Sequence, residues 1–190
     1  MLAPKPPRMS LDDFLVWEAK QDEKWELVDG VPIQRRTRMM AGGTGAHARI
    51  ASNIIRAVGN RLPAGPCVPY GSDLKVVSPT GASRYPDVTV DCGPYTRETR
   101  AAVDPRVVFE VLSPSNDWFT QVRLLEDYQA LETVEHIVFV NQEAPLAQIW
   151  SRDGAVWRRT EAAGAESDLA LPALQIALPM ASIYEGVTFE

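Results

Sequence analysis

The sequence lacks the features that mark membrane-spanning and secreted proteins. No apolar run in its 190 residues approaches the roughly 18 residues that a bilayer-spanning helix needs. Residues 1–9 are proline-rich without an apolar segment, so we expect a flexible tail there and no signal peptide. The only cysteines, Cys67 and Cys92, do not have the spacing of metal ligands. We therefore expect a cytoplasmic protein with no membrane partner and two buried, reduced thiols, a single disulfide being the open alternative.

An excess of positive charge is also absent. The formal net charge at pH 7 is −6, which argues against nonspecific binding of nucleic acid by the whole surface. A local basic groove stays open as an alternative to solvated surface charges, because arginines cluster in three places. The clusters are Arg35, Arg36 and Arg38; Arg97 and Arg100; and Arg158 and Arg159.

Length and periodicity predict a single α/β domain over residues 10–190. Helices are expected over about 10–20, 44–62 and 117–131. Hairpins are expected at Asp29-Gly30 and Asp153-Gly154. The expected strands are "SDLKVV", "YPDVTV", "RVVFEVL" and "VEHIVFVN". Because buried strands joined through a helix lie parallel, we expect a mixed β-sheet flanked by helices, with added β-hairpins.

Two carboxylates in these strands need a chemical reason. Glu110 lies among apolar residues in "VVFEVLSPSN", and Asp87 follows Pro86 in "YPDVTV". Neighbouring strands are about 4.8 Å apart, so the two carboxylates can approach closely, where they repel each other unless a cation lies between them. A hard ion such as Mg²⁺ suits this arrangement. The alternative is that Asp87 caps a turn and that Glu110 pairs with Arg84 or Arg106.

Pro-Asp, an interval of about twenty residues, and then a Glu between apolar residues resembles the PD-(D/E)xK nuclease superfamily. Within it, the whole chain resembles the Uma-two family of restriction-endonuclease-like proteins. The matching stretches are "WELVDGVP", "GAHARIASNI", "YPDVTV", "FEVLSPSN", "LEDYQAL…VEHIVFV" and "IYEGVTF". The resemblance implies a restriction-endonuclease-like fold and a DNA endonuclease that uses Mg²⁺ or Mn²⁺ on Asp87 and Glu110. It also implies that Glu26 points into the same pocket.

The two histidines lead to different expectations. The family resemblance places a histidine in the helix of His47, which predicts a role for His47 near the phosphate as part of the catalytic set. The alternative is a structural histidine between helix and sheet. His136 begins a buried strand, and we expect it to be structural.

A lysine is missing where the resemblance calls for one. The superfamily motif expects it at Leu112, and the Uma-two family expects it at Leu124, four residues before Tyr128. The chain has no lysine after Lys75. Such a lysine would orient or deprotonate the attacking water. Arg123 and Lys75 are candidate substitutes, but the helical wheel turns Arg123 to solvent beside Glu126 and Asp127, while Leu124 falls in an apolar stripe.

Two functions therefore stay open. The first is a DNA endonuclease impaired by Leu124, and the second is an inactive nuclease fold that binds nucleic acid or protein. The oligomeric state is undetermined, a homo-oligomer being compatible with the sequence.

Overall fold

The computed structural model describes residues 8–34, 44–113 and 118–189. The helices are α1 (Leu11–Glu18), α2 (Gly45–Gly59), α3 (Trp118–Gln129) and α4 (Met180–Ile183), with a 3₁₀ turn η1 (Pro172–Leu174). The first six strands are β1 (Trp25–Val28), β2 (Val31–Gln34), β3 (Val68–Gly71), β4 (Val76–Val77), β5 (Ser83–Arg84) and β6 (Val88–Asp91). The others are β7 (Pro105–Leu112), β8 (His136–Asn141), β9 (Leu146–Asp153), β10 (Val156–Ala163), β11 (Asp168–Leu171) and β12 (Ile176–Pro179). Among these described residues, no helix is long and apolar enough to cross a membrane.

The central sheet is mixed, as the sequence predicts. Its six strands run in the order β10-β9-β8-β7-β6-β3. β7 and β8 are parallel, and α3 forms the crossover between them, because parallel neighbours cannot be joined by a tight turn. The other neighbours are antiparallel. β6 and β7, the strands that hold the two carboxylate motifs, are therefore hydrogen-bonded neighbours.

Each face of this sheet is covered by its own apolar cluster. Val107, Phe109 and Val111 of β7 pack in the cluster that includes α2. Val108 packs in the cluster that includes Leu124 and Tyr128 of α3. Because side chains of a strand alternate between faces, Glu110 lies on the α3 face.

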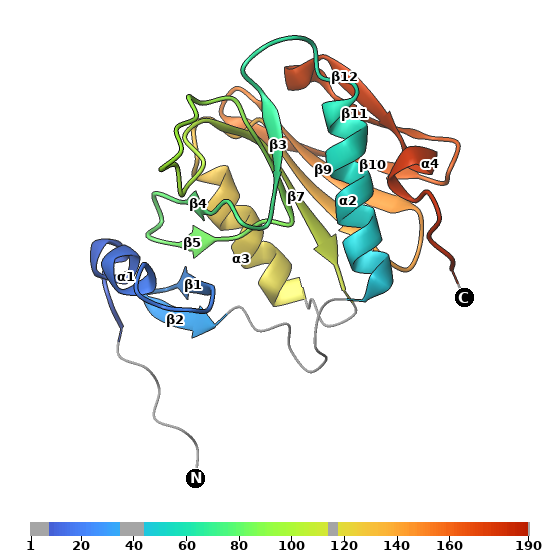
Figure 1. The fold of residues 1–190 in the computed structure, drawn as a ribbon. Helices are drawn as coiled ribbons and strands as arrows, with labels where there is room; N and C mark the ends of the chain where they lie inside the picture. Colours follow the sequence, from blue (N-terminus) through green and yellow to red (C-terminus); the bar gives the residue numbers. More distant parts are fainter. Residues whose placement is uncertain (1–7, 35–43, 114–117, 190) are drawn as a thin grey trace.

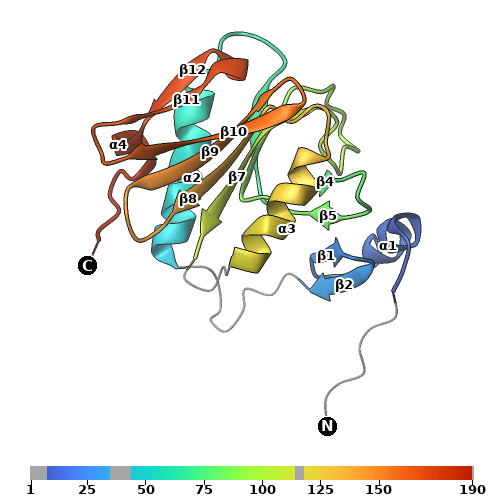
Figure 2. The ribbon, with the colours of Figure 1, turned by 180° about the vertical axis from the view of Figure 1, so that it is seen from behind.

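A smaller sheet lies beside α3, together with α1 (Figures 1 and 2). It has the strand order β2-β1-β5-β4. The β1–β2 hairpin turns through Asp29 and Gly30, whose φ angles are 50° and 73°. This left-handed pair is why Asp-Gly predicts the turn. The small sheet brings Glu26 on β1 and Arg84 on β5 toward α3.

The two cysteines form a disulfide, so the expectation of reduced thiols is wrong. β3 and β6 pair with Val68 opposite Asp91. One step further along this register places Cys67 opposite Cys92, and the two are joined. The sequence did not reveal this pairing because β3 was not predicted as a strand.

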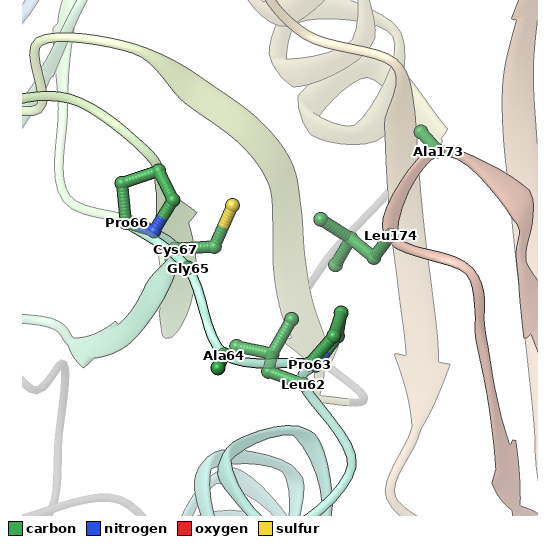
Figure 3. A pocket seen from close by; sticks show the side chains of 8 residues that line it. All are labelled: Leu62, Pro63, Ala64, Gly65, Pro66, Cys67, Ala173 and Leu174. Carbon is green, nitrogen blue, oxygen red and sulfur yellow. The ribbon is translucent and has the colours of Figure 1, made fainter.

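Cys67 also lines an apolar pocket (Figure 3). The pocket follows the C-terminal end of α2 and is closed by Ala173 and Leu174. Gly59, the last residue of α2, lies about 18 Å along the helix from His47, at 1.5 Å per residue, and the pocket begins beyond it at Leu62. Its lining carries no charged side chain, so it does not suit a phosphodiester.

Removing the disulfide should destabilise the fold. The bridge closes a loop with a sequence separation of 25 residues. By lowering the conformational entropy of the unfolded chain, it adds about 3 kcal/mol to the free energy of unfolding. We expect Cys67→Ala/Cys92→Ala to lose about this much free energy of unfolding in urea denaturation. Dithiothreitol should lower the midpoint of the parent protein but not that of the double variant. The disulfide would be contradicted if dithiothreitol left the urea midpoint of the parent unchanged and if both thiols of the untreated parent could be labelled.

His136 is a structural histidine, as expected. It is 3% exposed, its Nδ1 lies 2.9 Å from Ser151 Oγ on β9, and its Nε2 accepts the Ala173 N–H at 3.2 Å. An Nε2 that accepts a hydrogen bond belongs to a neutral ring, so Nδ1–H donates to the serine. Burial lowers the pKa of His136 to about 4.

This lowered pKa predicts a loss of stability in acid. His136 takes up a proton near pH 6.5 in the unfolded chain and near pH 4 in the folded chain. The contribution of neutral His136 to the free energy of unfolding is therefore complete above pH 6.5 and falls as the pH drops toward 4. Between pH 7 and 4.5 the loss is about 2 kcal/mol. Urea denaturation at the two pH values should show that the free energy of unfolding of His136→Gln drops less than that of the parent, by this amount. Equal drops in parent and variant would assign the acid sensitivity to other groups.

Candidate active site around Asp87 and Glu110

Asp87 and Glu110 come from the same end of the β6–β7 pair. Val88 pairs with Phe109 and Thr89 with Val108. Asp87 directly precedes β6, and Glu110 directly follows Phe109 in β7. The Asp87 carboxylate binds the main chain of Val111, the residue after Glu110. The sequence prediction that these two motifs form neighbouring strands is confirmed.

The Asp87 carboxylate is fixed from two sides. It is 8% exposed. Its Oδ2 accepts the Val111 N–H at 2.8 Å, and its Oδ1 lies 3.2 Å from His47 Nε2. Asp87 therefore binds the main chain of the neighbouring strand at the residue after Glu110. The sequence left open that Asp87 caps a turn, and this bond to β7 is a different role.

His47 reaches Asp87 from the first turn of α2. Thr44 caps this helix, accepting the His47 N–H at 3.1 Å and donating to Gln142 Oε1 at 3.1 Å. Gln142 lies just after β8, so the start of α2 is attached to the end of the central sheet. The imidazole is about one-quarter exposed. It thus lies between solvent and the carboxylate.

Glu110 is hydrogen-bonded by Tyr128 of α3, the helix that covers this face of the central sheet. The hydroxyl of Tyr128 donates to Glu110 Oε1. Tyr128 is fully buried. Burial raises the pKa of its hydroxyl well above 10, and the nearby Glu110 carboxylate raises it further. The tyrosine therefore stays protonated and remains a hydrogen-bond donor.

Glu26 enters the cluster through a buried ion pair. Its Oε1 accepts the Tyr85 N–H at 3.2 Å, and its Oε2 lies 3.4 Å from Arg84 Nη1. Arg84 also donates from Nε and Nη2 to Asp127 Oδ2, at 2.8 and 2.6 Å. Burial alone would lower the pKa of Arg84, but Asp127 and then Glu26 raise it, so the guanidinium stays charged. The Glu26 carboxylate also raises the pKa of Tyr128, the residue that binds Glu110.

The two candidate substitutes for the missing lysine are engaged elsewhere. Lys75 forms an ion pair with Glu18, and its side chain is largely buried. Arg123 pairs with Asp29 on the β1–β2 turn, at the partly solvent-exposed surface that the helical wheel predicts. Leu124 is 7% exposed and packs with Val108 and Tyr128, so the prediction of core packing is confirmed.

Sequence reasoning missed the roles of Arg84 and Asp127. It placed Asp127 on the solvent side of its helix, but Asp127 is 9% exposed and is bound by Arg84. The one available signal was a charged residue, Arg84, directly before the buried Tyr-Pro-Asp motif.

The basic clusters do not converge on this site in the described residues. Arg158 and Arg159 pair with Asp153 and Glu161 on the β9–β10 hairpin. Arg97 and Arg100 are exposed in a loop. The cluster of Arg35, Arg36 and Arg38 lies outside the described residues.

The site has more negative than positive charge. Four carboxylates, Glu26, Asp87, Glu110 and Asp127, accompany one guanidinium and one imidazole among the described residues. The described residues contain no group of three or more His, Cys, Asp or Glu side chains placed to hold a metal ion. Mg²⁺, however, is usually held by only one or two carboxylates and keeps several waters. The hard oxygens of Asp87 and Glu110 therefore fit such an ion.

A comparison with protein families identifies the group to which this sequence and fold belong. The Uma2 family model, described as "Putative restriction endonuclease", matches residues 11–181. The chain belongs to the Uma2 family. The resemblance that the six sequence motifs carried is thereby confirmed.

Two proteins of known sequence or structure are similar to this Uma2 chain. The uncharacterized protein slr1290 of Synechocystis sp. is 28% identical over 186 residues, which cover 96% of this chain and 95% of that protein. The crystal structure of a "putative nuclease belonging to DUF820" from Anabaena variabilis matches with a TM-score of 0.73 at 15% identity. The match covers 95% of this chain and 99% of that one. At this identity the match shows the fold, a nuclease-like mixed α/β architecture, as predicted.

If Asp87 and Glu110 bind a divalent ion, the ion should stabilise the fold. A ligand that binds only the native state adds RT ln(1 + [L]/Kd), or about 2.7 kcal/mol at 100 times Kd. We expect Mg²⁺ or Mn²⁺ to raise the melting temperature of the parent in calorimetry, and Asp87→Asn to abolish this rise. Asp153→Asn, which changes an exposed carboxylate on the β9–β10 hairpin, should keep it. The same metal response in Asp87→Asn and the parent would place the ion elsewhere.

Proposed function

We propose that this Uma2 chain is a Mg²⁺-dependent DNA endonuclease, with Mn²⁺ as an alternative ion, whose hydrolysis of phosphodiesters is impaired by Leu124. The observation that carries the proposal is the hydrogen bond from the Val111 N–H to Asp87 Oδ2, which brings the Asp87 carboxylate to the residue directly after Glu110. Two carboxylates that lie close together repel each other unless a cation lies between them. The family description and the similar nuclease structure support the same reaction class.

Asp87 and Glu110 would hold the ion. When bound, a divalent ion supplies positive charge at the phosphoryl oxygens and lowers the pKa of a water molecule. The protein prepares the two ligands differently. Asp87 is oriented by the Val111 N–H and by His47, whereas Glu110 is oriented by Tyr128.

His47 and Glu26 complete the proposed catalytic set. His47 Nε2, 3.2 Å from Asp87 Oδ1 and partly exposed, can hold a proton between the carboxylate and an incoming substrate. Imidazole is suited to this exchange because its two ring nitrogens can donate and accept a proton. Glu26, which accepts from the Tyr85 N–H and from Arg84, would be the third carboxylate of the set.

Leu124 is the reason to expect slow cleavage. It packs one helical turn before Tyr128, on the face of the sheet that also carries Glu110. A lysine stem there would follow the same apolar surface and bring its ammonium toward the carboxylates. Loss of a positioned acid or base costs about 10²–10⁴ in rate.

The leucine at position 124, where the family pattern expects lysine, also favours a second candidate function. A nuclease fold that lacks its lysine can persist as a module that binds nucleic acid or protein without cleaving it. Ion binding by Asp87 and Glu110 does not separate the two functions, because both retain the carboxylates. Cleavage does separate them.

Leu124→Lys should restore or enhance metal-dependent nicking of plasmid DNA. The variant supplies the cation that the family pattern expects, and it should fold because the lysine stem replaces leucine on the same surface. We expect nicking with Mn²⁺ to rise by about 10²-fold or more over the parent. Adding Asp87→Asn to this variant should remove the gain.

Leu125→Lys is the matched control, because it places a lysine on the neighbouring residue of the same helix. It should nick no faster than the parent. Robust cleavage by the parent itself would show that the chain is not impaired by Leu124. Failure of Leu124→Lys to nick while it still binds Mn²⁺ would favour the binding module.

A further inference from the structure

Two consecutive residues near the end of α3, Asp127 and Tyr128, contact site residues from the small sheet and from the central sheet. Tyr128 donates its hydroxyl to Glu110 on the central sheet. Asp127 binds Arg84 of the small sheet, and Arg84 reaches Glu26 on the adjacent strand β1. The last turn of one helix is therefore attached to carboxylates that come from two different sheets.

We propose that Tyr128 is a positioning residue that orients Glu110 for cation binding, and that Asp127 does the same for Glu26 through Arg84. This inference rests on the proposed metal-dependent function. It adds to that function the residues that determine how tightly the ion is held.

Tyr128 is suited to this task because its own position is fixed. Its ring is fully buried among Leu124, Val108 and Phe139. A tyrosine hydroxyl has one proton to donate, and here the proton is directed to Glu110. Glu110 itself is only half-buried. A flexible glutamate held in one orientation before the ion arrives has less conformational freedom to lose on binding.

Asp127 is fixed just as fully. Thr80 Oγ1 donates to Asp127 Oδ1 at 2.7 Å, and Arg84 donates to Oδ2. The Asp127 main-chain oxygen accepts from Ser78 Oγ at 2.7 Å. These bonds leave Arg84 Nη1 directed at Glu26. Partners in the outer shell of a metal site typically change metal affinity by 10- to 100-fold when they are removed.

Tyr184 offers a matched control on the other face of the sheet. It is also a buried tyrosine, but its hydroxyl proton is shared between the main-chain oxygens of Asn141 and Leu146, and among the described residues no carboxylate is its hydrogen-bond partner. Burial raises its pKa to about 12, against a smaller opposing effect of the Leu146 N–H. Tyr184→Phe and Tyr128→Phe therefore remove the same atom from two buried tyrosines, which are 6% and 0% exposed.

The experiment compares Mn²⁺ affinity and metal-free stability in the parent and the two variants. Mn²⁺ titration followed by electron paramagnetic resonance gives Kd, and urea denaturation gives stability. We expect Tyr128→Phe to weaken Mn²⁺ binding by about tenfold or more, and Tyr184→Phe to lower stability with Kd unchanged within twofold. Asp127→Asn, which keeps the side-chain shape, should weaken Mn²⁺ binding in the same direction as Tyr128→Phe.

The outcomes separate this inference from the proposed function. If the parent binds no Mn²⁺, the metal-dependent function fails and the inference falls with it. If the parent binds Mn²⁺ and Tyr128→Phe binds it equally well, only the inference is overturned, and Tyr128 is structural. If Tyr184→Phe weakens Mn²⁺ binding as much as Tyr128→Phe does, the effect is general loosening of the fold, and the inference is likewise overturned.

Discussion

The buried ion pair between Arg84 and Asp127 is the interaction on which the geometry of the site depends. Arg84 comes from β5 in the small sheet, and Asp127 comes from α3, which packs on the central sheet. Both side chains are largely shielded from water. Breaking a buried pair by removing one partner typically costs about 3–5 kcal/mol, because the remaining charge has no compensation. The pair therefore sets where Glu26 lies relative to Glu110.

Two other cations near the small sheet, Lys75 and Arg123, also form ion pairs within the fold. Lys75 is held by Glu18, and Tyr85 donates to the same carboxylate at 2.7 Å. Arg123 is held by Asp29 and lies over the Phe119 ring. A side chain fixed in this way cannot reach a substrate phosphate without losing its partner. Neither Lys75 nor Arg123 is therefore available to replace the lysine that the family pattern expects.

The sequence predicted the elements that long periodic segments specify. The α2 helix and the strands around Asp87 and Glu110 were predicted from apolar periodicity, and the family resemblance added Glu26 and His47. The Arg84–Asp127 pair could not be predicted this way, because it joins residues 43 positions apart and helical periodicity placed Asp127 toward solvent. The Cys67–Cys92 bridge was missed for a similar reason. It requires β3, a strand of four residues that contains Pro69 and Gly71, and both residue types are unfavourable in strands.

The packing around Tyr128 and Glu110 favours leucine over the lysine that the family pattern expects at position 124. Leu124 and Tyr128 belong to one apolar cluster with Val108 and Ile137, and Leu124 is nearly as buried as the tyrosine. An ammonium at this depth would have to be desolvated, whereas a leucine gains from burial by about 2 kcal/mol. Leucine at position 124 therefore favours the rigid contact between Tyr128 and Glu110 while it removes a positive charge from the site. Under the proposed function, stability of the apolar cluster around Tyr128 and reactivity toward a phosphodiester would therefore be opposed at position 124.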